Sequence, residues 1–217
     1  MGFLDSHIII EHLSFTCKNG AMNFLKIFSN KRRKDRLGTI KPSSLRDSLV
    51  VLINYFNQQD IKYALVGGIA LAARGVVRGT RDIDFLIDQQ DALKVHELMS
   101  KLGFSSLNQG ISVISYLLER LRVDFLIARR ERGHSILKRA QLVSVSKNVM
   151  AKIVTLEDLI CLKLQAVVED PQRGRDRLDI IELLRTQHAH VSIDKIREEA
   201  INLGAEGEFN EILSNID

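Results

Sequence analysis

The spacing of hydrophobic residues changes along the chain and divides it into two parts. Apolar residues recur at helical spacing from Leu45 to Phe56, directly after Ser44, a typical N-cap residue. Strand patterns follow at residues 63–66, 82–88, 121–127 and 141–146. Short helices are expected between them, at 69–74 and 91–101. From Thr155 onward the spacing is helical, with helices expected at 155–169, 176–187, 192–203 and 206–214.

This pattern predicts a mixed α/β fold followed by an α-helical part. We expect a basic, flexible leader at residues 1–41, an α/β core at 42–150 and a helical C-terminal subdomain at 151–217. The first 21 residues show no structural pattern, and Met22 is an alternative start of translation.

The composition places the chain among globular proteins. Over 217 residues it is 45% hydrophobic and 27% charged, which excludes disordered and fibrous classes. No apolar run approaches the roughly 18–20 residues that a membrane span needs. The two cysteines, Cys17 and Cys161, lie far apart without metal-ligand spacing, which favours a reducing, cytoplasmic location.

The net charge of +4 is unevenly distributed. Residues 22–41 hold seven basic side chains and one acidic one, a net of +6, which leaves −2 for the rest of the chain. A basic run is usually a solvated tail, and binding to nucleic acid or to an anionic lipid is the functional alternative.

Three aspartates carry the main indication of chemistry. Side chains alternate along a strand, so Asp82 and Asp84 project from one face, about 6–7 Å apart. Carboxylates so placed repel each other unless a cation lies between them. Asp124 has similar apolar flanks in a later strand, and the three carboxylates converge if the two strands are neighbours. Such hard oxygen ligands suit Mg²⁺, and two ions can clamp the attacking and leaving oxygens of a nucleotidyl transfer.

An Asp-x-Asp alone is also typical of the solvent face of an edge strand. Gly67-Gly68 supports the functional interpretation, because it ends a strand and opens a helix where bare backbone N–H groups can approach a triphosphate. The alternative for the glycines is a tight turn that needs positive φ.

These residues resemble the motif of the nucleotidyltransferase superfamily with the DNA polymerase β-like fold. The stretches that carry the resemblance are Val66-Gly67-Gly68, Arg78 to Phe85, Asp124, Thr155 to Leu164, and Arg175 to Ile180. Over residues 45–185 the chain looks most similar to AbiEii-type toxins and their uncharacterised relatives. The resemblance implies a small mixed sheet with flanking helices, followed by an α-helical C-terminal subdomain. Gly68 departs from the motif, since many members carry a serine there whose hydroxyl helps to hold phosphate.

Lys163 lies within the apolar stripe of the helix expected at 155–169. A buried ammonium needs an anion, which a triphosphate or an acid cluster would supply. The alternative is a lysine at the edge of the stripe whose head group reaches water. The resemblance implies that this lysine is part of the site.

Asp179 follows Arg175 by four residues, so a surface ion pair on a helix is its default interpretation. The resemblance implies a functional acid in this helix instead. Arg78 and Arg81 flank Thr80 just before the first acidic strand, and they contact nucleotide phosphates or balance the acids.

The resemblance implies an Mg²⁺-dependent enzyme that moves a nucleoside monophosphate from an NTP to an acceptor hydroxyl. Two ions are expected, with Mn²⁺ as an alternative; Asp82 and Asp84 would hold both, and Asp124 would bind one and help to activate the acceptor. The expected nucleotide contacts are Gly67, Gly68, Arg78, Thr80, Arg81, Lys163 and Asp179.

The acceptor stays open at this point. It is a tRNA, a protein side chain as in antitoxins that AMPylate a toxin, or a small molecule such as an antibiotic. The competing class is a non-catalytic module that binds nucleotides or a cognate toxin or antitoxin. The sequence does not indicate an oligomeric state.

Overall fold

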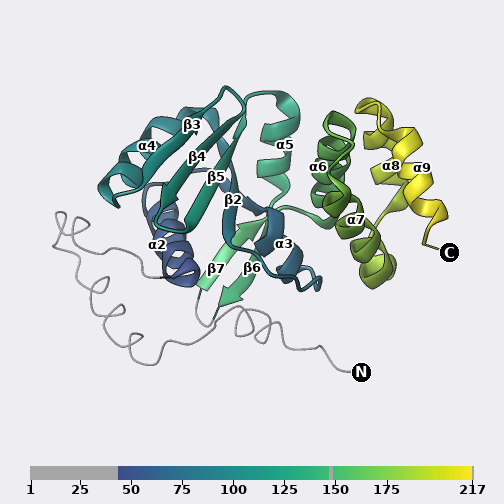
Figure 1. The fold of residues 1–217 in the computed structure, drawn as a ribbon, viewed down its shortest axis with the longest axis horizontal. Helices are drawn as coiled ribbons and strands as arrows, with labels where there is room; N and C mark the ends of the chain where they lie inside the picture. Colours follow the sequence, from purple (N-terminus) through teal and green to yellow (C-terminus); the bar gives the residue numbers. More distant parts are fainter. Residues whose placement is uncertain (1–43, 147–148, 217) are drawn as a thin grey trace.

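The computed structural model describes residues 44–146 and 149–216. The leader expected at residues 1–41, with the alternative start at Met22, lies outside these described residues. The described chain forms a seven-stranded mixed sheet with helices on both faces, and a group of helices at one end (Figure 1).

The strand order of the sheet is β3-β4-β5-β2-β1-β7-β6. The strands are β1 (Tyr63–Val66), β2 (Asp82–Asp88), β3 (Ser105–Gln109), β4 (Val113–Leu118), β5 (Leu121–Ala128), β6 (Gln141–Ser146) and β7 (Val149–Ile153). Pairing is parallel between β2 and β5 and between β1 and β7, and antiparallel in the other four pairs.

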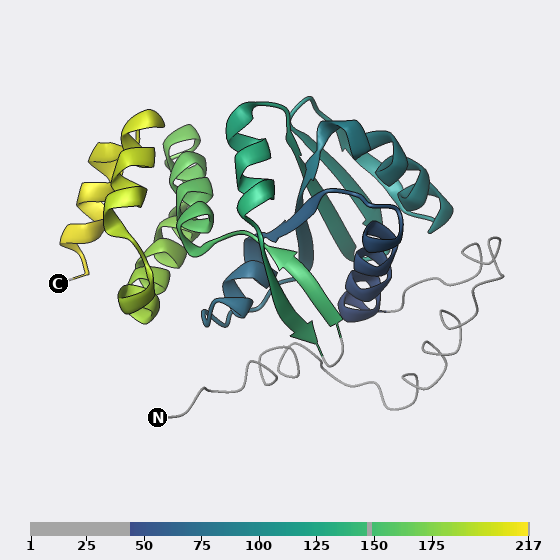
Figure 2. The same ribbon diagram turned by 180° about the vertical axis from the view of Figure 1, so that it is seen from behind.

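The helices fall into two sets. Within the α/β part are α2 (Leu45–Gln58), α3 (Gly67–Ala73), the short 3-10 helix η4 (Gln89–Asp91), α4 (Ala92–Lys101) and α5 (Glu131–Arg139). The helical end holds α6 (Leu156–Glu169), α7 (Gly174–Gln187), the 3-10 helix η5 (His188–His190), α8 (Ile193–Asn202) and α9 (Glu206–Ser214). Figure 2 shows this second set gathered beside α5 and α3, away from α2 and α4.

Side-chain caps fix the starts of the two longest apolar helices of the sequence pattern. The Ser44 hydroxyl accepts a hydrogen bond from the backbone N–H of Asp47 at the start of α2. The Thr155 hydroxyl accepts one from Asp158 at the start of α6. Both satisfy a backbone donor that the helix itself leaves free.

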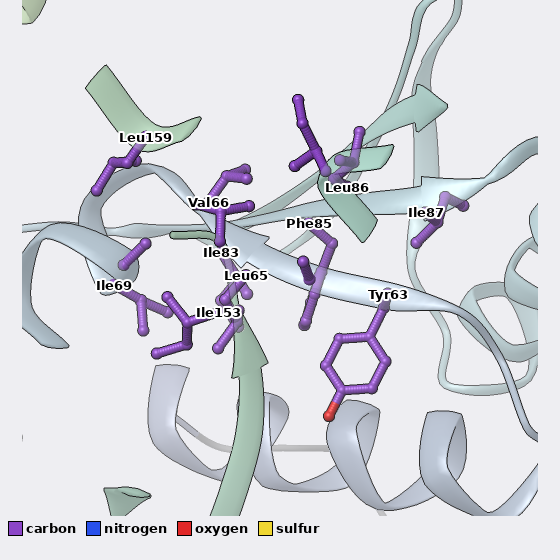
Figure 3. Packing of buried hydrophobic residues seen from close by; sticks show 14 of the residues in the cluster. Tyr63, Leu65, Val66, Ile69, Ile83, Phe85, Leu86, Ile87, Ile153 and Leu159 are labelled. Atoms are coloured by element: carbon purple, nitrogen blue, oxygen red, sulfur yellow. The ribbon is translucent and has the colours of Figure 1, made fainter. Parts of the chain in front are cut away.

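One part of the core lies between the sheet and α2, and the same cluster extends through the other helices to α9. Phe56 of α2 packs against Tyr63 of β1 and Phe85 of β2, with ring centroids 5.2 and 5.1 Å apart. Phe85 in turn stacks on Phe125 of β5, at 5.6 Å and 11°. Figure 3 shows part of this packing around β1 and β2. Because side chains alternate, the neighbours of Phe85 and Phe125 along these strands project from the opposite face.

Polar contacts join the helical end to the α/β part. Arg139 of α5 pairs with Asp158 of α6 at 2.6 Å. Arg132 of α5 donates to Gln165 of α6 at 2.7 Å and also pairs with Glu199 of α8. Two helices of the helical end, α6 and α8, are thereby tied to α5 of the α/β part.

Among residues 44–146 and 149–216, the strands β3, β4 and β7, the helix α5 and the short 3-10 helices η4 and η5 were not expected from the sequence. β3 is exposed along its whole length, so it lacks the apolar alternation that identifies a strand. β7 pairs with both β1 and β6, so residue 150, where we divided core from C-terminal subdomain, lies inside a strand of the sheet. In the described part of the chain, no helix is both long and apolar enough to cross a membrane.

Candidate active site

The three aspartates lie on adjacent strands and on one face of the sheet. β2 and β5 run parallel without a bulge, and their register places Asp84 opposite Asp124 and Asp82 opposite Arg122. Their odd-numbered neighbours Ile83 and Phe85 are fully buried on the other face. The predicted convergence of the two strands is therefore what the structure shows.

The surroundings of Asp84 change the acidity of its carboxyl. Burial and repulsion from Asp124 and Asp82 raise the pKa of Asp84 from 3.8 to about 6. A hydrogen bond from the backbone N–H of Gly68 and the positive charge of Lys163 act in the opposite direction. A carboxylate held in this way is stabilised by any cation that enters.

Gly67 is required at its position for two reasons. Its φ is +61°, a backbone conformation that residues other than glycine rarely adopt. A Cβ at this position would also stand 2.0 Å from Oδ2 of Asp84. The first glycine is thus what lets the backbone between β1 and α3 approach the acidic strand so closely.

Gly68 is required by its contact with Thr80. A Cβ at residue 68 would lie 2.7 Å from both Cβ and Oγ1 of Thr80. The departure from the Gly-Ser motif therefore has a structural reason, since the Thr80 side chain fills the space that a serine would occupy. The hydroxyl missing at residue 68 is replaced in that space by the hydroxyl of Thr80, which also contacts the backbone carbonyl of Asp82 at 3.2 Å.

Lys163 lies in a buried charge cluster and not at the edge of its apolar stripe. Its ammonium donates to Asp176 Oδ1 and to Asp179 Oδ2, both at 2.7 Å. Lys163, Asp176 and Asp179 are 6%, 9% and 4% exposed. The alternative of a lysine that reaches water is thus wrong, because an acid cluster, one of the two expected kinds of anion, surrounds its ammonium.

Two arginines complete this cluster. Arg78, from the loop before β2, lies 2.9 Å from Asp179 through Nε, as a contact between charges and not an aligned hydrogen bond. Arg173 pairs with Asp176 at 2.7 Å. The default interpretation of Asp179 as the partner of Arg175 is therefore wrong, because its carboxylate is buried against Lys163 and Arg78.

The expected site residues thus form two neighbouring groups. Asp82, Asp84, Asp124, Gly67 and Gly68 belong to the acidic strands and the β1–α3 turn. Lys163 and Asp179 come from α6 and α7, and Arg78 links them to the loop that carries Thr80. Arg81 is exposed in that loop. The charge of Lys163 reaches Asp84, which places the two groups within electrostatic range of each other.

Two further residues of the site did not emerge from the sequence. Asp176 precedes Asp179 by three residues, and this spacing on a helix places both on one face, which was the available signal. Arg122 precedes Asp124 by two residues, so the strand period already puts both on one face. Its Nε donates to Asp124 Oδ1 at 2.8 Å.

The donor chemistry fits magnesium or manganese, since these ions prefer carboxylate oxygens, and the group offers the half-buried Asp84 and Asp124 beside the exposed Asp82. Across residues 44–146 and 149–216, however, no group of three or more His, Cys, Asp or Glu side chains is arranged to hold a metal ion. One oxygen of Asp124 is directed at Arg122 in this arrangement.

The sequence profile of a family described as "Nucleotidyl transferase AbiEii toxin, Type IV TA system" matches residues 52–212. This chain belongs to the AbiEii family. The match covers β1, both acidic strands and the helical end as far as residue 212 in α9, so it includes both groups of site residues. The protein is therefore a nucleotidyltransferase, as the sequence motif predicted. A search of curated proteins gives no match.

Solved structures agree on the fold. The chain is similar to the solution structure of the antibiotic-resistance factor ANT(2'')-Ia, with a TM-score of 0.51 and 15% identity over 78% of this chain and 95% of that one. The chain is also similar to a crystal structure of ANT(2")-Ia in complex with adenylyl-2"-tobramycin, with a TM-score of 0.52 and 12% identity over 73% of this chain and 98% of that one. At these identities the likeness concerns the fold alone, and it confirms the nucleotidyltransferase fold expected from the sequence.

Proposed function

We propose that this AbiEii-family protein transfers a nucleoside monophosphate from an NTP to an acceptor hydroxyl with the help of Mg²⁺. The observation that carries the proposal is the pair Asp84 and Asp124, aligned on parallel strands, with the pKa of Asp84 raised by its acidic neighbours. Such an arrangement is destabilising by itself and becomes favourable when cations bind.

In the proposed reaction the acceptor oxygen forms a bond to the α-phosphorus of the NTP. The bond from that phosphorus to the α–β bridging oxygen breaks, and pyrophosphate leaves. Asp124 takes the proton of the acceptor hydroxyl. Asp82 and Asp84 would hold two divalent ions, with Asp124 as a further ligand of one. When bound, such ions supply positive charge next to the attacking and leaving oxygens.

The triphosphate would lie between the two groups of the site. Gly67 and Gly68 keep the β1–α3 turn free of side chains, and Thr80 offers a hydroxyl beside it. Lys163, Arg78 and Arg81 supply positive charge on the other side, and Asp179 holds the first two in place. The helical subdomain would in this way close one side of the nucleotide site.

We propose tRNA as the acceptor, in the cytoplasm, where NTP and tRNA occur together. Two features support it: the family is described as a toxin, and residues 22–41 carry a net charge of +6. If the basic leader binds RNA phosphates, its deletion should flatten the dependence of log affinity on log salt, by roughly 0.7–0.9 for each phosphate that is no longer neutralised.

The test is to incubate the full chain with each α-labelled NTP, Mg²⁺ and total tRNA, and to locate the label. Label on RNA supports the proposal. Label on a protein would replace tRNA by a protein acceptor, as in an AMPylating antitoxin, and label on an added antibiotic such as tobramycin would indicate a small-molecule acceptor.

The matched variants are Asp84→Asn, which removes the central carboxylate, and Glu97→Gln, which removes an exposed carboxylate on α4. We expect Asp84→Asn to lose transfer and Glu97→Gln to keep it. If no NTP gives label on any acceptor, or if Asp84→Asn transfers like the native protein, the proposed function is wrong. A non-catalytic module that binds nucleotides or a cognate partner then takes its place.

A further inference from the structure

A positively charged side chain, that of Arg122, lies among the three aspartates. Arg122 lies directly opposite Asp82 in the parallel register of β2 and β5. The facing pair Asp84 and Asp124 follows two residues further along the strands, on the same face. Arg122 is the positively charged member of a row that otherwise holds carboxylates. Its location follows from the sequence, since residues 122 and 124 share a strand face.

The arginine is held from two strands. Nε donates to Asp124 Oδ1 at 2.8 Å, and Nη2 donates to Ser115 Oγ of β4 at 3.2 Å. Ser115 is 1% exposed, so the second contact is anchored in the sheet. The Asp124 side chain is 16% exposed and that of Arg122 is 48% exposed, so the guanidinium has access to water on its outer side.

The acids act on Arg122 as a group. A hydrogen bond from Arg122 to Asp124 and the charges of Asp124, Asp82 and Asp84 raise the pKa of the Arg122 guanidinium. In the absence of metal, Arg122 therefore neutralises part of the repulsion among the three carboxylates. The same contact commits one oxygen of Asp124 that a metal ion would otherwise use.

We propose that Arg122 is the built-in counter-ion of this site, and that an incoming divalent cation displaces it from Asp124. This inference rests on the proposed function, because it presupposes that the acids bind metal. Arg122 then acts as a positioning residue: it keeps the metal-free site intact and sets the cation concentration at which the site fills. With one side of its head group already in water, Arg122 can turn outward without leaving a buried charge.

The consequence for metal binding follows from charge. A unit positive charge about 5 Å from a divalent ion in a water-like medium opposes binding by about tenfold. Removing it should strengthen binding by that factor and, at the same time, weaken the metal-free fold, since the acids lose their partner. A merely structural arginine would change the second property without the first.

The experiment measures Mn²⁺ binding to the full chain by calorimetry without nucleotide, together with the Tm in EDTA. Arg122→Met removes the charge and keeps the length of the side chain. Arg122→Lys keeps the charge but loses the planar fork. Arg120→Met removes an exposed charge in the turn before β5 and serves as the matched control.

We expect Arg122→Met to bind Mn²⁺ about tenfold more tightly and to melt at a lower temperature in EDTA. Arg122→Lys should bind Mn²⁺ close to the native affinity, and Arg120→Met should match the native protein in both measurements. If Arg122→Met binds Mn²⁺ as the native protein does, or more weakly, the inference is overturned while the proposed function stands. If neither the native chain nor any variant binds Mn²⁺ at millimolar concentration, the proposed metal site is wrong and the inference is overturned with it.

Discussion

Replacing Asp84 by asparagine should make the metal-free protein more stable at neutral pH. Burial and the neighbouring acids raise the pKa of Asp84 from 3.8 to about 6. The folded chain therefore keeps this proton between pH 3.8 and about 6, whereas the unfolded chain releases it. Stability falls as pH rises through this window, because the folded state binds more protons than the unfolded state.

The size of the effect follows from that shift. A difference of about two pKa units corresponds to about 3 kcal/mol of unfolding free energy at neutral pH. Because Asp84 is only partly buried, we expect about 1–3 kcal/mol, or a Tm increase of about 2–10 °C for a chain of this length. The hydrogen bond from the Gly68 N–H is retained, since the asparagine side chain offers an oxygen in the same place.

The assay is thermal unfolding of native and Asp84→Asn proteins in EDTA, from pH 4.0 to 8.0, with Glu97→Gln as the control. The stability difference should be largest above pH 7 and should shrink toward pH 4, while the control tracks the native protein throughout. Added Mg²⁺ with NTP should raise the Tm of the native protein and of Glu97→Gln, but not that of Asp84→Asn. A difference that is independent of pH, or a variant less stable than the native protein at pH 7.5, would refute the electrostatic reasoning.

Three further outcomes are expected. Gly67→Ala should lower the unfolding free energy by at least about 2 kcal/mol in urea titration, since it meets both a positive φ and the Asp84 carboxylate; an unchanged midpoint would contradict the close approach. Lys163→Met should cost about 2–4 kcal/mol in the same titration, because it leaves two buried carboxylates with one arginine each; a neutral variant would argue against the cluster. In a Cys17→Ser background, Cys161 of α6 should resist thiol reagents at pH 8 in the folded protein, since burial raises the pKa of its thiol to about 12. Rapid labelling would contradict the burial of this thiol.

The sequence was sufficient for those parts of the site that depend on local period. Alternation in β2 placed Asp82 and Asp84 on one face, whereas the convergence with Asp124 depended on a strand pairing that only the structure shows. The boundaries of β1, β2 and β6 agree with those expected. These elements are predictable because burial on one or both faces imposes a regular pattern on them.

The rest depends on tertiary contacts that leave little local signal. β3 is exposed along its length, and α5 contains Gly133, so neither carries the pattern of its class. The partners of Lys163, Asp176 and Asp179, come from another helix, and no spacing in the sequence indicates which anion meets this lysine. The reason for Gly68 is likewise visible only once Thr80 is seen packed against it.

The unbroken register between β2 and β5 links the positions of the acidic side chains to the packing of the core. The stacked rings of Phe85 and Phe125 on one face and the facing carboxylates of Asp84 and Asp124 on the other are fixed by the same row of backbone hydrogen bonds. A slip of one residue would exchange the two faces and place aromatic rings where the acids stand. If Asp84 and Asp124 act as proposed, natural selection cannot tune packing and catalysis separately along these strands. Drift in the aromatic core should appear first as lost transfer, in proteins that still fold.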